Sequence, residues 1–321
     1  MPTDPNPYIF SIGLLASFGA SISTLEWIHG RRHLKDDGLF SWLVIGNRSL
    51  TLRPPLLAAV LNRLLSFRPF VCILILRFFA LLSLPFALWF GHGTVPVLAL
   101  VVLTSLLMHL RSPWGMDGSD QMSTQIFGAL FLGQLGGTSL ACKASLWYIA
   151  GQSCLSYLTA GVVKAASQHW HGTNVVFAIF NTRTYGYKPF ARYLLERPRI
   201  AKTLAWGAVI MECAFSLALV AGFPGCLVFL AWGVAFHVMN AVVMGLNSFF
   251  WSFVATYPAV IYCAIAIERF RLEGGNNSWV VFTPILIALG LSMRWLYEFA
   301  RKQNRKSALE SDPSTRLKNA Q

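Results

Sequence analysis

The fold is decided by the stretch Phe70-Val-Cys-Ile-Leu-Ile-Leu-Arg77-Phe-Phe-Ala-Leu-Leu-Ser-Leu-Pro-Phe-Ala-Leu-Trp-Phe90, which carries a single charged side chain. About 20 apolar residues in a helix span the hydrocarbon core of a bilayer, so the stretch predicts a transmembrane helix. Arg77 lies within about two turns of the expected cytoplasmic end. We interpret it, like Arg294 in a later run, as a long cation that reaches the lipid headgroups.

The composition of the whole chain extends this interpretation. Of the 321 residues, 55% are hydrophobic and only 12% are charged, and the mean hydropathy is +0.55. A soluble domain contains about 25% charged residues. A transmembrane barrel would show alternating segments of about ten residues, and we find none. We predict an all-α protein, a polytopic bundle of transmembrane helices in the cell membrane, with the lipid bilayer as its main partner.

Nine hydrophobic segments are expected to span the membrane, with boundaries defined to within several residues. They cover about residues 8–28, 70–90, 94–110, 122–141, 145–166, 203–222, 224–246, 248–267 and 279–299.

The distribution of Lys and Arg between these segments predicts the orientation. Cations concentrate in residues 29–69, in the loop after Lys164 and after residue 300, whereas the loops near Gly91, Lys143 and Gly222 carry almost none. Cytoplasmic loops of membrane proteins are enriched in Lys and Arg. We therefore expect the N-terminus outside and the C-terminus in the cytoplasm.

We expect three parts along the chain. Residues 1–65 hold the first span and a basic segment, residues 66–300 form the bundle, and residues 301–321 form a basic, disordered cytoplasmic tail. Residues 47–67 alternate apolar clusters with arginines around Pro54-Pro55. This pattern favours either a short amphipathic helix on the inner leaflet or a plain loop.

The net charge and the cysteines exclude other classes of function. The formal net charge is +13, but the cations lie between the hydrophobic runs, where topology and anionic lipids explain them, so we expect no nucleic-acid partner. None of the six cysteines forms a C-x-x-C pair. We interpret them as small buried apolar side chains and expect neither a disulfide framework nor a metal site.

Lys164 ends a long apolar run and is the first candidate functional residue. An ammonium ion at a helix centre costs about 2.5–3.5 kcal/mol on insertion scales, and less near an interface. On a helix, Tyr157, Gly161 and Lys164 share one face, and Gly161 would let another helix or a ligand approach beside the lysine. The alternative is a lysine that extends to the cytoplasmic headgroups.

Glu212 lies near the middle of its span. A carboxylate there is usually protonated, paired or functional. It could pair with Lys164 or a histidine, or form hydrogen bonds as a neutral acid inside the bundle.

His237, Asn240, Met244 and Asn247 fall at helical spacing, which predicts one stripe on one helix. Such a stripe faces protein or a cavity rather than lipid. Histidine adds a group that exchanges protons near neutral pH, so the stripe is a candidate for catalysis or ligand contact as well as for interhelical hydrogen bonding.

The loop Asp117-Gly-Ser-Asp120 is acidic. We expect Ser119 or Asp120 to cap the following helix, and we regard the two aspartates as a weak signal for a cation. Motifs of hydrolases and nucleotide-binding proteins, such as G-x-S-x-G, H-E-x-x-H and the Walker A loop, are absent from the sequence.

The motif around Lys164 resembles a known signature. Tyr157-x-x-Ala-Gly161-x-x-Lys164, followed by Trp170-x-Gly, resembles that of the HTTM family, the membrane domain shared with vitamin K-dependent gamma-carboxylase. The stretch Phe236-His237-x-x-Asn240, the aromatic run 249–253 and the turn ending in Asp120 are also similar to that family. The resemblance covers roughly residues 66–300. The length and the additional N-terminal span are similar to the SdpB-like bacterial members, which take part in maturation of a secreted antimicrobial peptide.

The resemblance implies chemistry built on a lysine base. It implies that Lys164 deprotonates a quinol such as menaquinol or vitamin K hydroquinone, and that His237 hydrogen-bonds a quinone oxygen or an intermediate. The residues expected to line the cofactor site are Tyr157, Gly161, Trp170, Asn240 and Glu212. The sequence departs from the carboxylase because it has no counterpart of the large water-facing substrate domain, so we do not expect gamma-carboxylation itself.

Three functions remain open from the sequence. The first is a membrane enzyme, a carboxylase-like or other lyase that modifies a small secreted peptide. The second is a non-enzymatic partner or exporter that acts with a second maturation protein. The third is a proton-coupled transporter in which Glu212 and His237 form a proton relay, although matching broken helices in two halves of the chain are not found.

Overall fold

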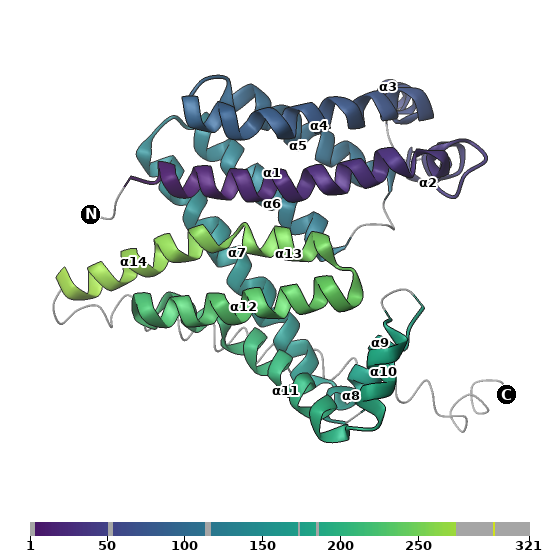
Figure 1. The fold of residues 1–321 in the computed structure, drawn as a ribbon. Coiled ribbons are helices and arrows are strands. Elements are labelled where there is room, and N and C mark those ends of the chain that lie inside the picture. The colour runs from purple at the N-terminus through teal and green to yellow at the C-terminus, as the bar shows by residue number, and fades with distance from the viewer. Residues whose placement is uncertain are drawn as a thin grey trace. The chain divides into compact units, whose positions relative to one another are not determined.

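The computed structural model describes residues 4–50, 54–112, 117–172, 174–183, 186–273 and Glu298 (Figure 1). Within these residues the regular elements are helices, and no strand occurs. Six helices of the described part are long and apolar enough to cross a membrane. They are Asn6–His29 (α1), Phe67–Phe90 (α4), Thr94–Arg111 (α5), Pro198–Leu219 (α11 with η2), Gly222–Met244 (α12) and Asn247–Glu273 (α13 with α14). The six helices indicate a membrane protein and agree with the predicted all-α class.

Two further expected spans are also helical. The helices Gly118–Leu135 (α6) and Ser139–Ala166 (α7) occupy the segments expected at 122–141 and 145–166, but they are not among the six. Both contain many Ser, Thr, Gln and Gly residues. The expected span at 279–299, Arg294 and the tail after residue 300 lie outside the described residues. The count of nine spans and the orientation stay predictions.

The chain divides into two compact units, and the boundary between them falls inside α7 and inside α14 (Tyr257–Glu273). We call residues 3–150 with 247–262 the N-terminal unit. We call residues 151–246, with 263–273 of α14, the C-terminal unit. The division at residues 65 and 300 that we expect from the sequence stays a prediction.

In the N-terminal unit, α1 packs against α4, α6 and α13 (Asn247–Val254), and α4, α5 and α6 pack against one another in chain order. Small residues let α1 approach its neighbours closely: a side chain at Gly13 would meet Leu88 of α4, and one at Gly19 would meet Trp251 of α13. Close approach at small residues is the usual way in which membrane helices pack, because lipid is as apolar as the helix surface.

Arg111, at the end of α5, fixes the connection between α1 and α2 (Trp42–Leu50). Its side chain is fully buried and donates hydrogen bonds to the carbonyl oxygen of Leu34, at 2.9 Å, and to that of Phe40. The guanidinium also lies 5.6 Å from the ring centre of Trp42 and 5.5 Å from that of Phe70. The loop backbone and two aromatic faces thus take the place of water around this cation.

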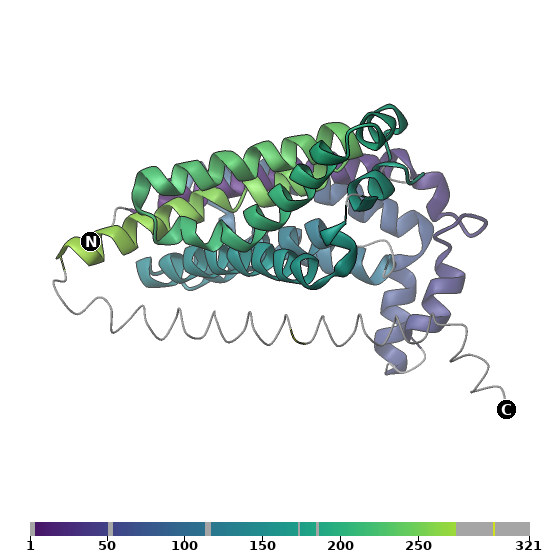
Figure 2. The same ribbon diagram turned by 90° about the horizontal axis from the view of Figure 1, so that it is seen from below.

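The basic segment forms two short helices, α2 and α3 (Pro55–Leu65), joined by a hydrogen bond of 2.9 Å from Trp42 Nε1 to Asn62 Oδ1. Figure 2 shows both helices running across the direction of the long helices of this unit. Leu61 and Leu65 of α3 are buried, whereas Leu56 and Val60 are exposed. A helix is therefore present from Pro55, whereas its amphipathic character and its position on the inner leaflet stay predictions.

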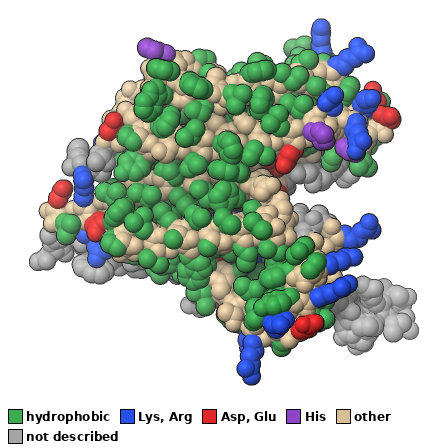
Figure 3. Space-filling model, viewed as in Figure 1, with side chains coloured by type: hydrophobic (Ala, Val, Ile, Leu, Met, Phe, Trp, Pro, Cys, Tyr) green, Lys and Arg blue, Asp and Glu red, His purple; other side chains and the backbone are tan. Residues whose placement is uncertain are grey.

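Side-chain types are segregated on the surface of the N-terminal unit. In Figure 3 hydrophobic side chains cover much of the face over α1 and α4, and Lys and Arg gather at the end that carries α2 and α3. Exposed cations of this region include Arg31, Arg32, Lys35, Arg63 and Arg68. Such a distribution is typical of a protein with one basic end at a membrane surface.

The cap of α6 differs from the expected one. The N-cap is Asp117, not Ser119 or Asp120, and its carboxylate accepts hydrogen bonds from the backbone N–H groups of both later residues, at 2.8 and 3.2 Å. Asp120 returns the bond, accepting from the Asp117 N–H at 3.3 Å. The result is a capping box, in which the first carboxylate satisfies the free N–H groups of the first helical turn.

The C-terminal unit is built on α11 (Pro198–Ala214), its 3₁₀ continuation η2 (Phe215–Leu219), and α12 (Gly222–Met244). Three short helices, α8 (Gln168–His171), α9 (Asn174–Phe180) and α10 (Lys188–Leu195), pack around the beginning of α11. Apolar residues of α9, α10 and α11 form a common core, which includes Val176, Phe180, Ala191, Leu194, Ala201 and Ala205.

The stripe expected at His237, Asn240, Met244 and Asn247 is wrong in one member. Helix α12 ends at Met244, because Gly245 adopts φ +73° and ψ 17°, a left-handed conformation that ends helices. The N–H of Leu246 then donates to the carbonyl oxygen of Asn240 at 3.3 Å. Asn247 therefore starts α13, a different helix.

Candidate functional site

Three residues of α7 form one side of the candidate site in the C-terminal unit. Tyr157, Gly161 and Lys164 follow one another at intervals of four and three residues, so they lie on one face of the helix, as predicted. Each of them meets α11 or α12: Lys164 contacts Glu212, Gly161 approaches Cys213, and Tyr157 contacts His237.

Lys164 and Glu212 form an ion pair. The ammonium nitrogen lies 2.5 Å from each carboxylate oxygen of Glu212. The glutamate side chain is 5% exposed and that of the lysine 23%. A carboxylate so deeply buried requires a partner, and the lysine supplies it with charge-assisted hydrogen bonds. Of the alternatives that the sequence leaves open for Glu212, pairing with Lys164 is the one observed.

Trp170 covers the other side of the lysine. Helix α7 ends at Ala166, and the short helix α8 follows directly, so the chain turns back at this point. The Lys164 ammonium lies 5.3 Å from the centre of the Trp170 ring. A cation at this distance from an indole is attracted by the electron-rich face of the ring. The lysine therefore interacts with two side chains of the protein, Glu212 and Trp170.

Gly161 brings α7 and α11 into contact. A Cβ atom at this position would lie 2.7 Å from the backbone nitrogen of Cys213 and 2.7 Å from its Sγ atom. These distances are shorter than side-chain contacts allow, so glycine is needed for the helices to approach. The close approach places the Glu212 carboxylate beside Lys164, one turn further along α7.

Tyr157 and His237 form the second polar pair. The Tyr157 hydroxyl lies 2.6 Å from Nε2 of His237, and both residues are buried, at 3% exposure each. Phe215 of η2 packs against the Tyr157 ring, with 4.0 Å between ring centroids. This packing holds the phenol in one orientation, so that its hydroxyl forms a hydrogen bond with the imidazole, in which either group can donate or accept.

One residue of each pair lies on α7, whereas the partners Glu212 and His237 lie on different helices. Tyr157 and Lys164 are two turns apart, which corresponds to about 10 Å along a helix axis. The site therefore contains an amine with a carboxylate at one level and a phenol with an imidazole at the other. All four groups are able to move protons, and apolar side chains surround them.

Asn240 is the predicted site residue that does not join the others. It lies one turn after His237 on α12 and is partly exposed, and its side chain makes no hydrogen bond to a described residue. Two contacts escaped sequence reasoning, Cys213 against Gly161 and Phe215 against Tyr157. The only sequence signal for them is that Cys213 and Phe215 lie one and three residues after Glu212. Among the described residues, no cluster of three or more His, Cys, Asp and Glu side chains could hold a metal ion.

Comparisons with known proteins give no independent assignment: no family model, no curated protein and no solved structure matches the chain. The function must therefore be argued from the geometry of the residues themselves.

Proposed function

We propose that this protein is a membrane enzyme of the HTTM type that uses Lys164 for proton transfer and contributes to the maturation of a small secreted antimicrobial peptide in the cell membrane. One observation carries the proposal. Lys164, Tyr157 and His237 of the HTTM-like motif lie in two buried pairs, Tyr157 with His237 and Lys164 with Glu212, a residue outside the motif.

The ion pair gives the lysine a route to its basic form. As an ammonium ion, Lys164 cannot accept a proton. If one proton passes from the ammonium to the Glu212 carboxylate, a free amine and a neutral carboxylic acid remain, and an apolar environment disfavours the separated charges. The amine then takes a proton from the substrate, and Glu212 holds the first proton until the substrate leaves.

The second pair has the role of orienting the substrate. His237 and Tyr157 present one ring nitrogen and one hydroxyl, which can donate to or accept from an oxygen atom of a bound molecule. Because Phe215 fixes the phenol, a substrate oxygen that replaces the Tyr157–His237 contact would meet groups that are already oriented.

The donor set fits the chemistry of a quinol. A quinol carries two weakly acidic hydroxyl groups on a flat apolar ring, and the site offers two proton-exchanging pairs with an indole beside one of them. In this proposal Lys164 and His237 would hold the hydroxyl groups, and Trp170 would contribute an apolar wall. A quinol, when bound, would supply two electrons as a reductant, which the protein side chains cannot do.

The test is mass spectrometry of a candidate peptide produced together with the full-length protein. Lys164→Ala should lower the yield of modified peptide by at least about 100-fold, since positioned acid–base groups contribute about 10²–10⁴-fold to rates. Lys143→Ala, a change of the other lysine on the same helix, is the matched control and should leave the yield unchanged. An unaltered product from folded Lys164→Ala protein would overturn the proposal.

The same experiment separates the alternatives. A partner or exporter would co-purify with a second protein and leave the peptide mass unchanged. A proton relay from Glu212 to His237 is not favoured by the geometry, because each of the two residues is engaged by a different side chain of α7.

A further inference from the structure

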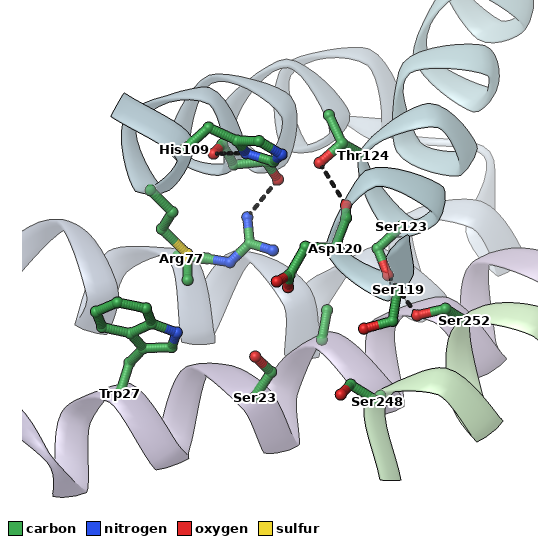
Figure 4. A pocket seen from close by; sticks show the side chains of 14 residues that line it. Ser23, Trp27, Arg77, His109, Ser119, Asp120, Ser123, Thr124, Ser248 and Ser252 are labelled. Carbon is green, nitrogen blue, oxygen red and sulfur yellow. Dashed lines mark hydrogen bonds between the residues drawn. The ribbon is translucent and has the colours of Figure 1, made fainter. Parts of the chain in front are cut away.

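A second polar site lies entirely within the N-terminal unit. It is a cavity of about 40 Å³ lined by α1, α4, α5, α6 and α13. Its wall contains many hydroxyl groups, for example those of Ser23, Ser123 and Ser248, and three groups that can carry charge, Arg77, His109 and Asp120 (Figure 4). No residue of the Lys164 site belongs to this cavity.

Arg77 is the cationic wall of the cavity, and its place corrects the interpretation from the sequence. The side chain does not extend to the headgroups, because Arg77 is only 5% exposed. Its Nε donates to Thr24 Oγ1 of α1 at 3.2 Å, and Nη1 donates to Val101 O at 3.0 Å and to Ser105 Oγ at 2.6 Å, both on α5. The guanidinium therefore links its own helix, α4, to two others, α1 and α5.

One edge of the guanidinium is left for a ligand. The second terminal nitrogen, Nη2, makes no hydrogen bond to any residue that the structure describes. Figure 4 shows the guanidinium of Arg77 pointing toward the Asp120 carboxylate, and both residues line the cavity. Nη2 is therefore open to the cavity, where it offers N–H groups to any acceptor that enters.

Asp120 is the anionic wall. It stands in the first turn of α6, where one oxygen of its carboxylate accepts from the Asp117 N–H at 3.3 Å. Asp120 forms no ion pair with Arg77 or with any other described residue. Two opposite charges therefore face the same small space without contact, although each influences the other electrostatically.

We propose that this cavity binds a small zwitterion, an α-amino acid of the size of glycine, with its carboxylate on Nη2 of Arg77 and its ammonium group on Asp120. A simple anion would face the Asp120 carboxylate, and a simple cation would face the guanidinium, whereas a zwitterion matches both walls. The hydroxyl groups complete the hydrogen bonds, since each can donate or accept. A cavity of about 40 Å³ favours a small ligand over a large one.

The charge of Asp120 gives the site a pH dependence. Burial raises the pKa of the Asp120 carboxyl, and the neighbouring Asp117 carboxylate raises it further, whereas His109 and Arg77 oppose the shift. When the pH falls through this pKa, Asp120 becomes neutral and loses its attraction for an ammonium group. Binding of the zwitterion should therefore weaken on acidification, while the Arg77 contact is retained.

The test is binding of radiolabelled glycine to the full-length protein in nanodiscs. Saturable binding is expected, with acetate and methylammonium each competing at least about tenfold more weakly than glycine, since each lacks one charge-assisted contact. Leucine should not compete. Saturable binding of acetate as tight as that of glycine, or no saturable glycine binding to folded protein, would overturn the proposal.

Three variants locate the site. Asp120→Asn should weaken glycine binding at least about tenfold, and Asp37→Asn, at an exposed aspartate of the same unit, is the matched control without effect. Ser23→Met should abolish binding by filling the cavity. Normal glycine binding in both Asp120→Asn and Ser23→Met would contradict the site. Lys164→Ala should bind glycine normally, so the result is independent of the proposed enzyme activity.

Discussion

Both carboxylate oxygens of Glu212 lie 2.5 Å from the ammonium nitrogen of Lys164, on a helix whose backbone touches α7 at Gly161. The ion pair and the helix contact belong to one arrangement, because the close approach at the glycine brings the carboxylate within reach of the lysine. A substitution that separates the helices at Gly161 should therefore also weaken the ion pair, and the reverse should also hold.

The ion pair should show a strong coupling energy. Lys164→Met leaves the buried carboxylate without its partner and should lower the free energy of unfolding by about 1–3 kcal/mol, with protonation of Glu212 limiting the loss. Glu212→Met should cost less, because the lysine is partly exposed and can turn to water. The double variant should be more stable than the sum of the two changes implies. Denaturant unfolding in detergent micelles measures all three, and additive effects would contradict the pairing.

The hydrogen bond between the Tyr157 phenol and the His237 imidazole can be removed by deleting one oxygen atom. Tyr157→Phe should cost about 1 kcal/mol of stability, the usual net value of one hydrogen bond, and should lower peptide modification if His237 acts with the hydroxyl. Tyr148→Phe, on the exposed part of the same helix, is the control that should change neither quantity. Equal stability of the two variants would show that the hydroxyl contributes nothing.

The contact of α7 with α11 requires glycine. Gly161→Ala should destabilise the protein by about 1–3 kcal/mol, because the added methyl group overlaps Cys213. In Gly151→Ala, on the same helix, the methyl group meets open space, so this variant should be as stable as the parent or more stable by up to about 1 kcal/mol. Thermal unfolding of the pair tests the geometry directly. A tolerated Gly161→Ala would be inconsistent with the close approach.

Arg77 should contribute far more to the free energy of unfolding than Arg68, the other arginine of α4. Arg77→Ala removes the bonds to α1 and α5 and leaves a cavity, so the free energy of unfolding should fall by about 2–4 kcal/mol. Arg68→Ala, at an exposed position of α4, should change it by less than about 0.5 kcal/mol. If both changes lowered the free energy of unfolding by a similar amount, the buried hydrogen bonds of Arg77 would not stabilise the protein.

The sequence predicts best what depends on local pattern. The long apolar runs predict the helices, and the spacing of Tyr157, Gly161 and Lys164 predicts their common face, because helical periodicity alone determines it.

The failures concern features that depend on three-dimensional contacts. Arg77 looks like a cation that reaches the headgroups, since its hydroxyl and carbonyl partners come from helices far away in the sequence. Asn247 is separated from His237 by a helix end at Gly245, and a single glycine in an apolar run does not distinguish a helix end from a packing contact. Likewise, the sequence leaves several partners open for Glu212, and the packing of α7 on α11 determines that the partner is Lys164.

The bonds of Arg77 also impose an order on the biosynthesis of the protein. When α4 leaves the ribosome, only Thr24 of α1 is available to the guanidinium, because Val101 and Ser105 of α5 have not yet been made. A bare guanidinium in the hydrocarbon is unfavourable by about 2.5–3.5 kcal/mol on insertion scales. We therefore expect α1 to stay close to α4 during insertion and α4 to enter the bilayer together with α5 as a hairpin, so that this part of the bundle assembles while the chain is being inserted.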